Sequence, residues 1–555
     1  MAAPTGLRDD AVWLEGRNAV SPSAQLPPHL QQAFGQAMAL AARGDLRQAT
    51  DLILRVRDGA PDSVEATTLA SVLMLQQGRY RAARRLALQA STLRVQPGDL
   101  LRIARLLRRF EESEALERMF LATPWRELDS APALAELAQL LGFSGLYQLA
   151  FECLAHAGSI DPASPDVHYL RGLFRMFSGD MAGSRDSVRR ALELEPRMVN
   201  AHWLLSMQEK ADSAEAHVAA MLRVLGAAEP GSEARAGFDY SLHHSYHALG
   251  RHAEAWQALA HGHATLRRLT RYSRREQGEL VAALERMTLP AFAPAPEPAG
   301  QTGLIFIVGM FRSGTTLLER LLAGHPDVQD GGETSTFSAC MRDATDCDGD
   351  QPLSPAIVAR APHADFAAVR ARMQQFANWR APEKRWLTEK LPSNFLHIGF
   401  ILHALPEARI LHMHRDPVDT CFSNLRTLFR GGAPYACDQE DLADYYVQYR
   451  RLMAHWHAIA PGRVLDVDYA RFVADPEAQA RRVMAHCGLD YVPGALDIGS
   501  RQGMAATASA AHVRQGVLKN RGQAWKPYEA QLQPLIRGLR EVLDDDAGGG
   551  AGATG

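Results

Sequence analysis

The stretch 307–322, IVGMFRSGTTLLERLL, sets the fold of the C-terminal half of this 555-residue chain. An apolar run, 304–308, leads into Gly309 and a small polar loop, and a helix-like leucine pattern follows. A strand, a glycine-containing loop and a helix in this order can bind an anion, because backbone N–H groups point outward at the helix N-terminus. The spacing of Gly309 and Gly314 fits the pattern G-x-x-x-x-G-K-[ST], yet Thr315 stands where that pattern has its lysine.

The loop can bind an anion without that lysine, because it carries donors of its own. Arg312 lies inside the loop, and Ser313, Thr315 and Thr316 add hydroxyl groups. In nucleoside triphosphatases the lysine serves the β- and γ-phosphates, so a ligand without a γ-phosphate does not require it. The residues predict a site for a compact, strongly anionic group, with an unusual nucleoside triphosphatase as the alternative.

The composition is that of an ordinary globular protein with more than one domain. Apolar residues make up 46% of the chain and charged residues 22%, and the net charge of −3 disfavours a nucleic-acid binder. Six cysteines without a C-x-x-C pair predict neither a zinc site nor a disulfide framework, so the cytoplasm is the expected compartment. The opening MAAPTGLRDDAVWLEG has no apolar segment typical of a secretory signal, and no apolar run is long enough for a membrane span.

Residues 30–270 have an almost continuous helical pattern with internal repeats. The segment GLFRMFSGDMAGSRDSVRRALELEP ends at Pro196, which lies 34 residues after Pro162, and GDLRQATDLILRVRDGAP, GRYRAARRLALQA and YHALGRHAEAWQALAHG share its turn-then-helix order. This pattern resembles the tetratricopeptide repeat, whose period is 34 residues. The resemblance implies an all-α solenoid with a concave binding surface, and a plain helical bundle is the alternative.

After the repeats the pattern changes. The segment LPAFAPAPEPAGQTG is rich in proline and alanine, so 271–300 is interpreted as a linker between halves that fold independently. Beyond it, the runs 304–308, 408–414 and 462–469 are predicted strands with helical patterns between them. This alternation predicts an α/β parallel sheet. The predicted domain boundaries are 301–543 for the sheet domain and 544–555 for a disordered, acidic and glycine-rich tail.

The longer stretch GMFRSGTTLLERLLAGHPDV resembles the 5′-phosphosulfate loop of the sulfotransferases, above all those of the tyrosylprotein type and bacterial relatives fused to tetratricopeptide repeats. The resemblance implies the sulfotransferase fold and the donor 3′-phosphoadenylyl sulfate (PAPS). The donor would be held by Arg312, Ser313, Gly314, Thr315 and Thr316. The family pattern is G-x-P-R-S-G-T-T, and Phe311 replaces its proline here, which costs the loop some rigidity.

A second stretch, RDPVDTCFSN, follows a predicted strand and carries Arg415 and, eight residues on, Ser423. In the family that it resembles, this pair binds the 3′-phosphate of PAPS, a group that ATP lacks. The alternative is a surface turn that begins a helix at 416–417.

The resemblance implies that Glu333 in GGET and Lys390 in TEKLPSN are catalytic, together with Arg312. Glu333 would accept the proton of the attacking hydroxyl, and Lys390 would neutralise charge that develops on the sulfuryl oxygens and the leaving phosphate. Each also fits an ordinary surface charge. Ser335 stands where tyrosylprotein enzymes have a basic residue for acidic substrates, so the sequence does not predict a preference for acidic peptides.

The remaining nucleotide contacts lie near the C-terminus. By resemblance, Tyr469 in VDYARFVADP packs near the adenine or its phosphate, although an ordinary buried tyrosine is the alternative. Ser509 in TASAAHVRQG would contact the 5′-phosphate side, and Arg514 would line the cleft. Ala524 replaces a basic residue of the family pattern, so that contact is expected at Lys519 or Lys526.

Metal binding is not predicted, because the histidines at 325, 412 and 414 have no third ligand at convincing spacing. The prediction is therefore an N-terminal tetratricopeptide solenoid joined to a PAPS-dependent sulfotransferase without a metal. The acceptor would be a hydroxyl, tyrosine-like, on a protein or peptide recruited by the repeats, and a homodimer is left open. Two alternatives remain: a scaffold protein with a vestigial nucleotide site, and a lysine-less P-loop kinase.

Overall fold

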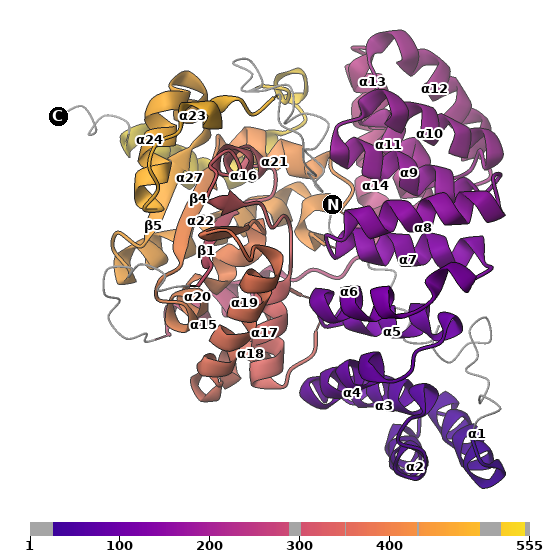
Figure 1. The fold of residues 1–555 in the computed structure, drawn as a ribbon. Coiled ribbons are helices and arrows are strands. Elements are labelled where there is room, and N and C mark those ends of the chain that lie inside the picture. Colours follow the sequence, from indigo (N-terminus) through magenta and orange to yellow (C-terminus); the bar gives the residue numbers. More distant parts are fainter. Residues whose placement is uncertain (1–25, 288–300, 350, 430–431, 500–522, 550–555) are drawn as a thin grey trace. The chain divides into compact units, whose positions relative to one another are not determined.

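The computed structural model describes residues 26–287, 301–349, 351–429, 432–499 and 523–549 (Figure 1). These residues divide into two compact units that alternate along the chain. The repeat unit comprises residues 26–167 and 334–379, and the sheet unit comprises residues 168–333 and 380–549. The boundary between the units therefore does not coincide with the predicted linker at 271–300.

In the repeat unit, consecutive helices pack in pairs, as the tetratricopeptide pattern predicts. Ala49 and Ala83 are fully buried, and small side chains of this kind let paired helices approach closely. Gly44 and Gly78, 34 residues apart, adopt positive φ values of 81° and 72°. Each lies in the turn that joins the two helices of one pair. The pairs are α1 (Pro28–Ala42) with α2 (Leu46–Gly59), α3 (Val64–Gln76) with α4 (Tyr80–Thr92), and α7 (Ala131–Phe143) with α8 (Tyr147–Ile160); α5 (Leu100–Arg109) and α6 (Ser113–Ala122) come between them in sequence.

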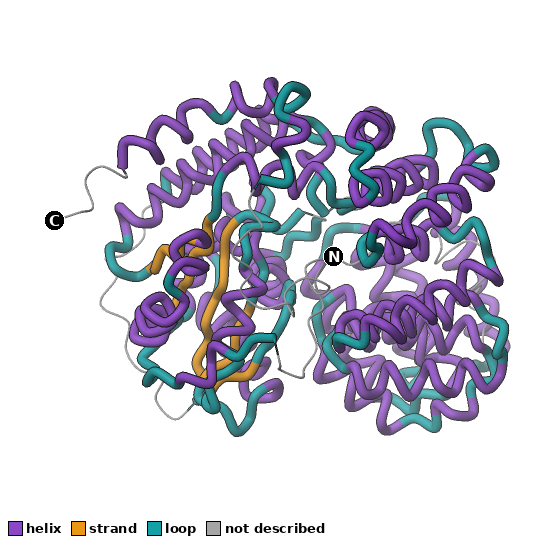
Figure 2. Tube along the Cα trace, turned by 90° about the horizontal axis from the view of Figure 1, so that it is seen from above, coloured by secondary structure: helices purple, strands orange, loops and turns teal. Residues whose placement is uncertain are grey.

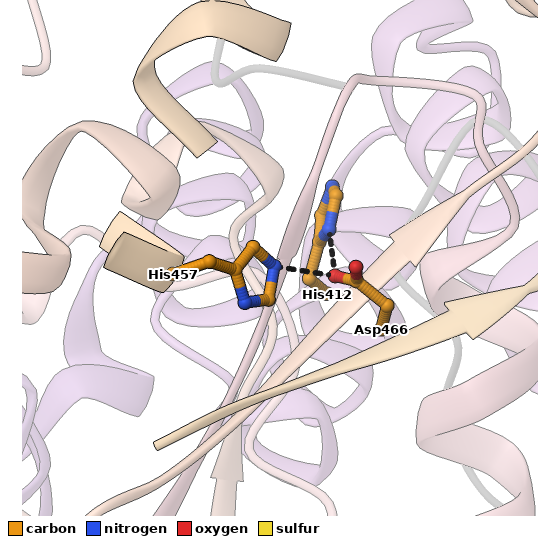
Figure 3. A group of neighbouring side chains, drawn as sticks. All are labelled: His412, His457 and Asp466. Atoms are coloured by element: carbon orange, nitrogen blue, oxygen red, sulfur yellow. Dashed lines mark hydrogen bonds and ion pairs between the residues drawn. The ribbon is translucent and has the colours of Figure 1, made fainter. Parts of the chain in front are cut away.

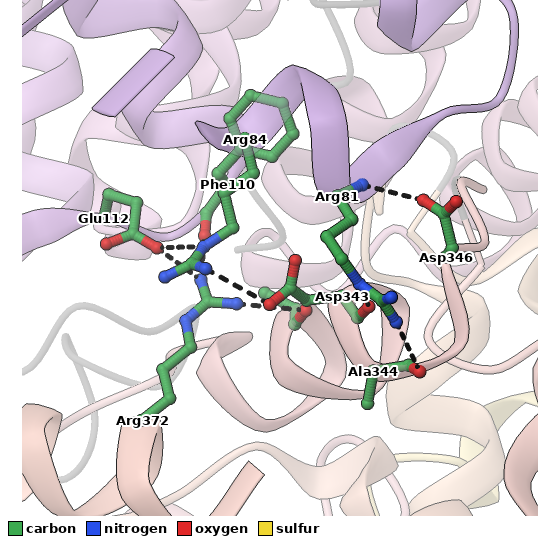
Figure 4. Close-up of polar contacts among 9 residues, drawn as sticks. Arg81, Arg84, Phe110, Glu112, Asp343, Ala344, Asp346 and Arg372 are labelled. Atoms are coloured by element: carbon green, nitrogen blue, oxygen red, sulfur yellow. Dashed lines mark hydrogen bonds and ion pairs between the residues drawn. The ribbon is translucent and has the colours of Figure 1, made fainter. Parts of the chain in front are cut away.

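The segment 334–379 joins this unit through arginines of the repeats. It forms α17 (Thr336–Thr345), α18 (Pro355–Arg360) and α19 (Phe366–Arg380). Arg81 donates to the carbonyls of Asp343 and Ala344, at 3.0 and 2.9 Å, and so places a positive charge at the C-terminus of α17 (Figure 4). Arg84 bridges Glu112 and Asp343 at 2.6 and 3.1 Å, which anchors the inserted segment to the repeats.

The helical pattern continues into the sheet unit. An added Cβ at Gly172 would lie 2.6 Å from Val188 Cγ2, so α9 and α10 pack more closely there than any larger residue would allow. Helix α15 lies within the segment that was predicted to be a linker. It is a packed helix there, because Leu280, Val281 and Leu284 form an apolar stripe that is buried. The helices are α9 (Pro165–Ser178), α10 (Met181–Leu194), α11 (Val199–Ser206), α12 (Ala211–Leu225), α13 (Glu233–Ala248), α14 (His252–Leu269) and α15 (Arg274–Glu285).

The sheet has five parallel strands in the order β2-β3-β1-β4-β5, with helices on both faces (Figure 2). The predicted strands are β1 (Gly303–Gly309), β4 (Arg409–His414) and β5 (Val464–Asp468), and the α/β prediction is confirmed. Two further strands, β2 (Val328–Gln329) and β3 (Trp386–Glu389), were not predicted, because they are too short for a clear pattern.

Successive side chains of each strand point to opposite faces of the sheet, so each face packs against its own set of helices. Ile305 and Ile307 of β1 pack in one core cluster with side chains of α16 (Thr315–Leu322) and α24 (Pro476–His486). On the other face lie α22 (Gln439–Ile459) and the 3-10 helix η6 (Pro392–His397), where Trp456 donates to the carbonyl of Phe395 at 2.8 Å. The remaining helices are α20 (Ile398–Ala404), α21 (Pro417–Leu425), α23 (Tyr469–Ala474), α26 (Gln533–Gly538) and α27 (Arg540–Gly549).

Helix α27 includes 544–549, the start of the predicted disordered tail. Asp546 pairs with Arg450 of α22, with Oδ1 and Nη2 2.7 Å apart. The acidic residues of the tail therefore extend a helix that is anchored by a basic partner on α22.

Two helices of the sheet unit, α13 and α14, hold α21 in place. His263 of α14 donates from Nε2 to the carbonyl of Leu425 at 2.9 Å, and His244 of α13 donates from Nε2 to the carbonyl of Arg426 at 2.8 Å. These carbonyls end α21 and would otherwise lack helical partners. The helices after residue 168 and the sheet thus belong to one compact unit, whereas the sequence placed them in two halves.

Histidines buried in α11, α13 and α14 predict a stability that falls with acid. Burial lowers the pKa of His202 to about 4 and of His247 to about 3, and it also lowers the pKa of His243 and His263. The unfolded chain therefore binds protons below pH 6.5 that the folded chain does not, and each ring removes up to about 1.4 kcal/mol of stability per pH unit.

Glu319 and His457 have raised pKa values, so their protonation stabilises the folded chain as the pH falls. The four histidines with lowered pKa values outnumber them. We expect the free energy of unfolding, measured in urea by tryptophan fluorescence, to decrease from pH 7.5 to 5.5. A value that stays constant or rises over this range would show that these rings titrate in the folded protein.

Candidate functional site

The loop after β1 has the tight backbone that an anion-binding loop requires. A Cβ on Gly309 would lie 2.3 Å from the carbonyl oxygen of Met413, and one on Gly314 would lie 2.7 Å from the ring of Tyr469. Both glycines also have positive φ values, 148° and 107°. Arg312 between them adopts φ 70°, which is costly for a side chain of its size. Such strain persists only where the surrounding structure imposes it, and it is common in ligand-binding loops.

Arg312 is joined to the second predicted anion contact. Its Nε donates to Ser423 Oγ at 3.2 Å, although Arg312 lies in the loop after β1 and Ser423 lies on α21, after β4. The side chain of Asn424, next to Ser423 on α21, donates to the carbonyl of Phe311 at 2.7 Å. Asn424 thus fixes the loop at the position where the family pattern has proline. No local sequence pattern marks this role, because the hydrogen bond joins the loop to a helix residue 113 positions away.

Arg415 follows β4 and completes a basic edge. Its guanidinium lies 4.8 Å from the ring centroid of Tyr469, the residue after β5, and 3.5 Å from Asp419. Arg312, Arg415 and Tyr469 therefore lie at the carboxyl ends of β1, β4 and β5. In open parallel sheets, ligands bind at this edge where the strand order reverses, here between β1 and β4.

The loop hydroxyls are buried next to these groups. Ser313, Thr315 and Thr316 are each at most 4% exposed. Among the described residues, Ser313 Oγ has no hydrogen-bond partner. A buried hydroxyl without a partner is costly, so a ligand oxygen that accepts from Ser313 would fit this loop.

A cavity of about 410 Å³ lies over this edge of the sheet. Its lining combines predicted residues with side chains from α11, α13 and the residues after α11, all in the sheet unit. The predicted residues are Arg312, Gly314, Thr316, Arg415, Ser423 and Tyr469, and Ala524 joins them. The repeats contribute Trp203, Ser206, Met207, Glu209, His244, His247 and Ala248, and α21 with the residues after it adds Asp419, Phe422, Arg426 and Thr427.

The cavity is suited to an anionic ligand with a flat, apolar part. Three guanidinium groups, from Arg312, Arg415 and Arg426, line it against two carboxylates, Glu209 and Asp419. Burial lowers the pKa of Arg426 to about 10, so this group stays charged at neutral pH. Aromatic rings of Trp203, Phe422 and Tyr469 lie in the same lining.

Glu333 and Lys390 are brought together beside the loop, but the described lining of the cavity does not include them. Lys390 Nζ lies 2.5 Å from Glu333 Oε1 and 3.9 Å from Glu319 Oε2. Glu319 of α16 accepts from Thr388 Oγ1 at 3.1 Å and from the backbone N–H of Gly332 at 3.0 Å. Glu319 therefore positions both the turn before Glu333 and the strand before Lys390.

Glu319 is a buried carboxyl group with a strongly raised pKa. Burial raises its pKa to about 7, although Lys390 lowers it in part. The sequence analysis missed Glu319, because a single glutamate within TTLLERLL reads as the polar position of an amphipathic helix.

Several predicted contacts fall elsewhere. Ser509, Arg514 and Lys519 lie outside the described residues. Lys526 is exposed and does not belong to the described lining of the cavity. His412, for which the sequence offered no third metal ligand, lies beside Asp466 and His457, which come from β5 and α22.

Comparisons with known proteins agree with this fold. Residues 305–493 match the model of the sulfotransferase family, so the C-terminal part of the chain contains a sulfotransferase-family domain. An uncharacterized protein of Aquifex aeolicus is 26% identical over 319 residues, which cover 56% of this chain and 42% of that protein. Protein-tyrosine sulfotransferase 2 of Gallus gallus is 26% identical over 191 residues, 34% of this chain and 52% of that protein. The chain thus spans about half the length of these relatives.

Two solved structures resemble separate parts of the chain. The sulfotransferase domain from the olefin synthase of Synechococcus PCC 7002 is 20% identical and covers 43% of this chain and 98% of that domain, with a TM-score of 0.26. The tetratricopeptide protein YrrB is 15% identical and covers 30% of this chain and 88% of that protein, also with a TM-score of 0.26.

None of the described helices is long and apolar enough to cross a membrane.

Proposed function

We propose that this chain transfers the sulfuryl group of PAPS to a hydroxyl group of an acceptor. The hydrogen bond from Arg312 to Ser423 carries this proposal, because it joins a strained anion-binding loop to Ser423, which lines the same cavity as Arg415, across the switch point of the sheet. A donor with two separate anionic ends requires two such groups. The 5′-phosphosulfate would bind the loop, and the 3′-phosphate would bind Arg415 and Ser423.

The cavity is suited to an adenine nucleotide with anionic groups. Three guanidinium groups line it against two carboxylates, and the rings of Trp203, Phe422 and Tyr469 offer surfaces for an adenine. A P-loop kinase would need a carboxylate at the end of the strand beside β1 to hold Mg²⁺. Glu389 has that position, but it is fully buried and accepts from Asn394 of η6 at 3.2 Å.

The proposed reaction is an in-line transfer. The acceptor oxygen attacks sulfur, the bond from sulfur to the phosphate oxygen breaks, and the acceptor proton passes to Glu333. Lys390 and Arg312 stabilise the charge on the sulfuryl oxygens and the leaving phosphate, and 3′-phosphoadenosine 5′-phosphate (PAP) departs. The ion pair between Lys390 and Glu333 keeps both groups in position before the substrates bind.

The acceptor is proposed to be a tyrosine-like hydroxyl on a protein or peptide that the helical repeats recruit in the cytoplasm. Repeat side chains line the cavity itself, so an acceptor bound along them would approach the donor directly. Intact-mass analysis of acceptor peptides incubated with PAPS tests this activity, and each transferred group adds one SO₃. A chain that folds and binds PAP yet modifies no hydroxyl compound would support the scaffold alternative.

The first prediction from this proposal concerns nucleotide selectivity. PAP should bind about ten- to a hundredfold more tightly than ADP, because charge-assisted contacts to the 3′-phosphate contribute about 1.5–3 kcal/mol. In Arg415→Ala the difference should shrink, whereas in the exposed control Arg471→Ala it should not. Calorimetry measures both affinities, and equal binding of PAP and ADP by the wild-type chain would remove the 3′-phosphate site from the proposal.

The second prediction concerns the base. Glu333→Gln should retain PAP binding and lose roughly 10²–10⁴ in turnover, the usual contribution of a general base. Asp327→Asn, an exposed acidic position a few residues earlier, is the matched control and should keep normal turnover. If Glu333→Gln turned over normally at saturating acceptor, Glu319, with its raised pKa, would become the candidate base.

A further inference from the structure

Two histidines and an aspartate that take no part in the proposed reaction converge on one point beside the sheet. His412 Nδ1 lies 2.6 Å from Asp466 Oδ1, and His457 Nε2 lies 2.9 Å from the same oxygen (Figure 3). One atom from each side chain falls within 4.8 Å of the others. These three residues are absent from the described lining of the nucleotide cavity, so they form a separate cluster.

The fold fixes this cluster from three elements that are distant in sequence. His412 and Asp466 are direct partners in the parallel ladder of β4 and β5, so both side chains point to the face that α22 covers. His457 lies in the last turn of α22 and reaches the pair from above the sheet. Because each side chain stands on a regular element, the three donor atoms are held together without a ligand.

We propose that His412, His457 and Asp466 bind a divalent transition-metal ion, with Zn²⁺ as the best match. Two imidazoles and one carboxylate are the protein ligands of many zinc sites that leave one position for water. Ca²⁺ and Mg²⁺ prefer sites made of oxygen ligands alone, so two ring nitrogens disfavour them.

Two of the three separations between donor atoms need only a small change to admit the ion. Zinc lies about 2.0–2.2 Å from nitrogen and oxygen ligands, which sets neighbouring donor atoms roughly 3.3 Å apart in a tetrahedron. The present distances of 2.6 and 2.9 Å would therefore open by less than an ångström. The side chains of His457 and Asp466 are 34% and 44% exposed, so water can reach the site.

A fourth residue orients the buried ligand. The Tyr449 hydroxyl of α22 forms a short hydrogen bond with His412 Nε2, and Tyr449 is itself buried. Metal-bound histidines usually hold their second ring nitrogen in a hydrogen bond of this kind, which fixes the ring and its tautomer. With the proton on Nε2 and Tyr449 as acceptor, Nδ1 presents its lone pair to the metal.

The ion would tie together the strands that carry the nucleotide residues. Arg415 directly follows β4, and Tyr469 directly follows β5. A metal bound by β4, β5 and α22 would therefore hold these three elements together, with water in its fourth position. The inference does not depend on the proposed sulfuryl transfer, since it concerns only ligand atoms of the folded chain.

The experiment uses the full chain without an affinity tag of histidines, stripped with chelator and desalted. Titration with ZnCl₂ in a calorimeter should show one equivalent bound with micromolar or tighter affinity. Co²⁺ should give the visible absorption of a four-coordinate site with nitrogen and oxygen ligands. His457→Gln and Asp466→Asn should each weaken binding more than tenfold, and Tyr449→Phe should weaken it by about tenfold, as loss of such an orienting contact usually does.

His455→Gln on the same helix and Asp468→Asn on the same strand are the matched controls and should keep the wild-type affinity. Zinc should also raise the melting temperature of the wild-type chain and leave that of Asp466→Asn unchanged. Two outcomes would overturn the proposal: a wild-type chain that binds no stoichiometric zinc, or undiminished binding by both His457→Gln and Asp466→Asn. In either case the three residues would be a hydrogen-bonded clamp between β4, β5 and α22.

Discussion

The sheet unit depends on two hydrogen bonds at the C-terminus of α21. His263 and His244, from α14 and α13, donate to the carbonyls of Leu425 and Arg426, which have no partner within the helix. Helix α21 begins two residues after Arg415 and carries Ser423 and Asn424. The repeat helices therefore fix the element on which the proposed 3′-phosphate site and the rigidity of the donor loop both rest.

From this constraint the rest of the site follows. Asn424 holds the carbonyl of Phe311, and Ser423 accepts from Arg312, so the strained loop and α21 support one another. The glycines at 309 and 314 then let the loop approach Met413 and Tyr469 at distances that a side chain would prevent. Buried and strained polar groups of this kind are costly, and His263, whose pKa is lowered by burial, adds to the sensitivity of the unit to acid.

Sequence patterns predicted the long elements well. The repeats, the strands β1, β4 and β5, and the loop between 309 and 316 each have a strong local period or fixed spacing, and all are present in the structure. The short strands β2 and β3 gave no such signal. The division into units was also missed, because the arginines that hold 334–379 to the repeats act across more than 250 residues.

Residues that complete the site through tertiary contacts could not be predicted for the same reason. Trp203 and His247 come from helical repeats whose pattern indicates only an apolar stripe. Glu319 gains its raised pKa from burial, which no motif encodes. Phe311, identified as a loss of rigidity, proved to have a compensating partner in Asn424, 113 residues away.

The dependence of nucleotide binding on the repeat helices is tested most directly by the PAP affinity of two matched variants. His263→Leu removes a ring that caps α21, and His261→Leu removes an exposed ring from the same helix. Calorimetry at pH 7.5 should show that His263→Leu weakens PAP binding about tenfold or more, since loss of a buried hydrogen bond costs about 1–3 kcal/mol. His261→Leu should bind as the wild type does. Equal affinity in both variants would contradict the account, because α21 would then hold its position without the repeats.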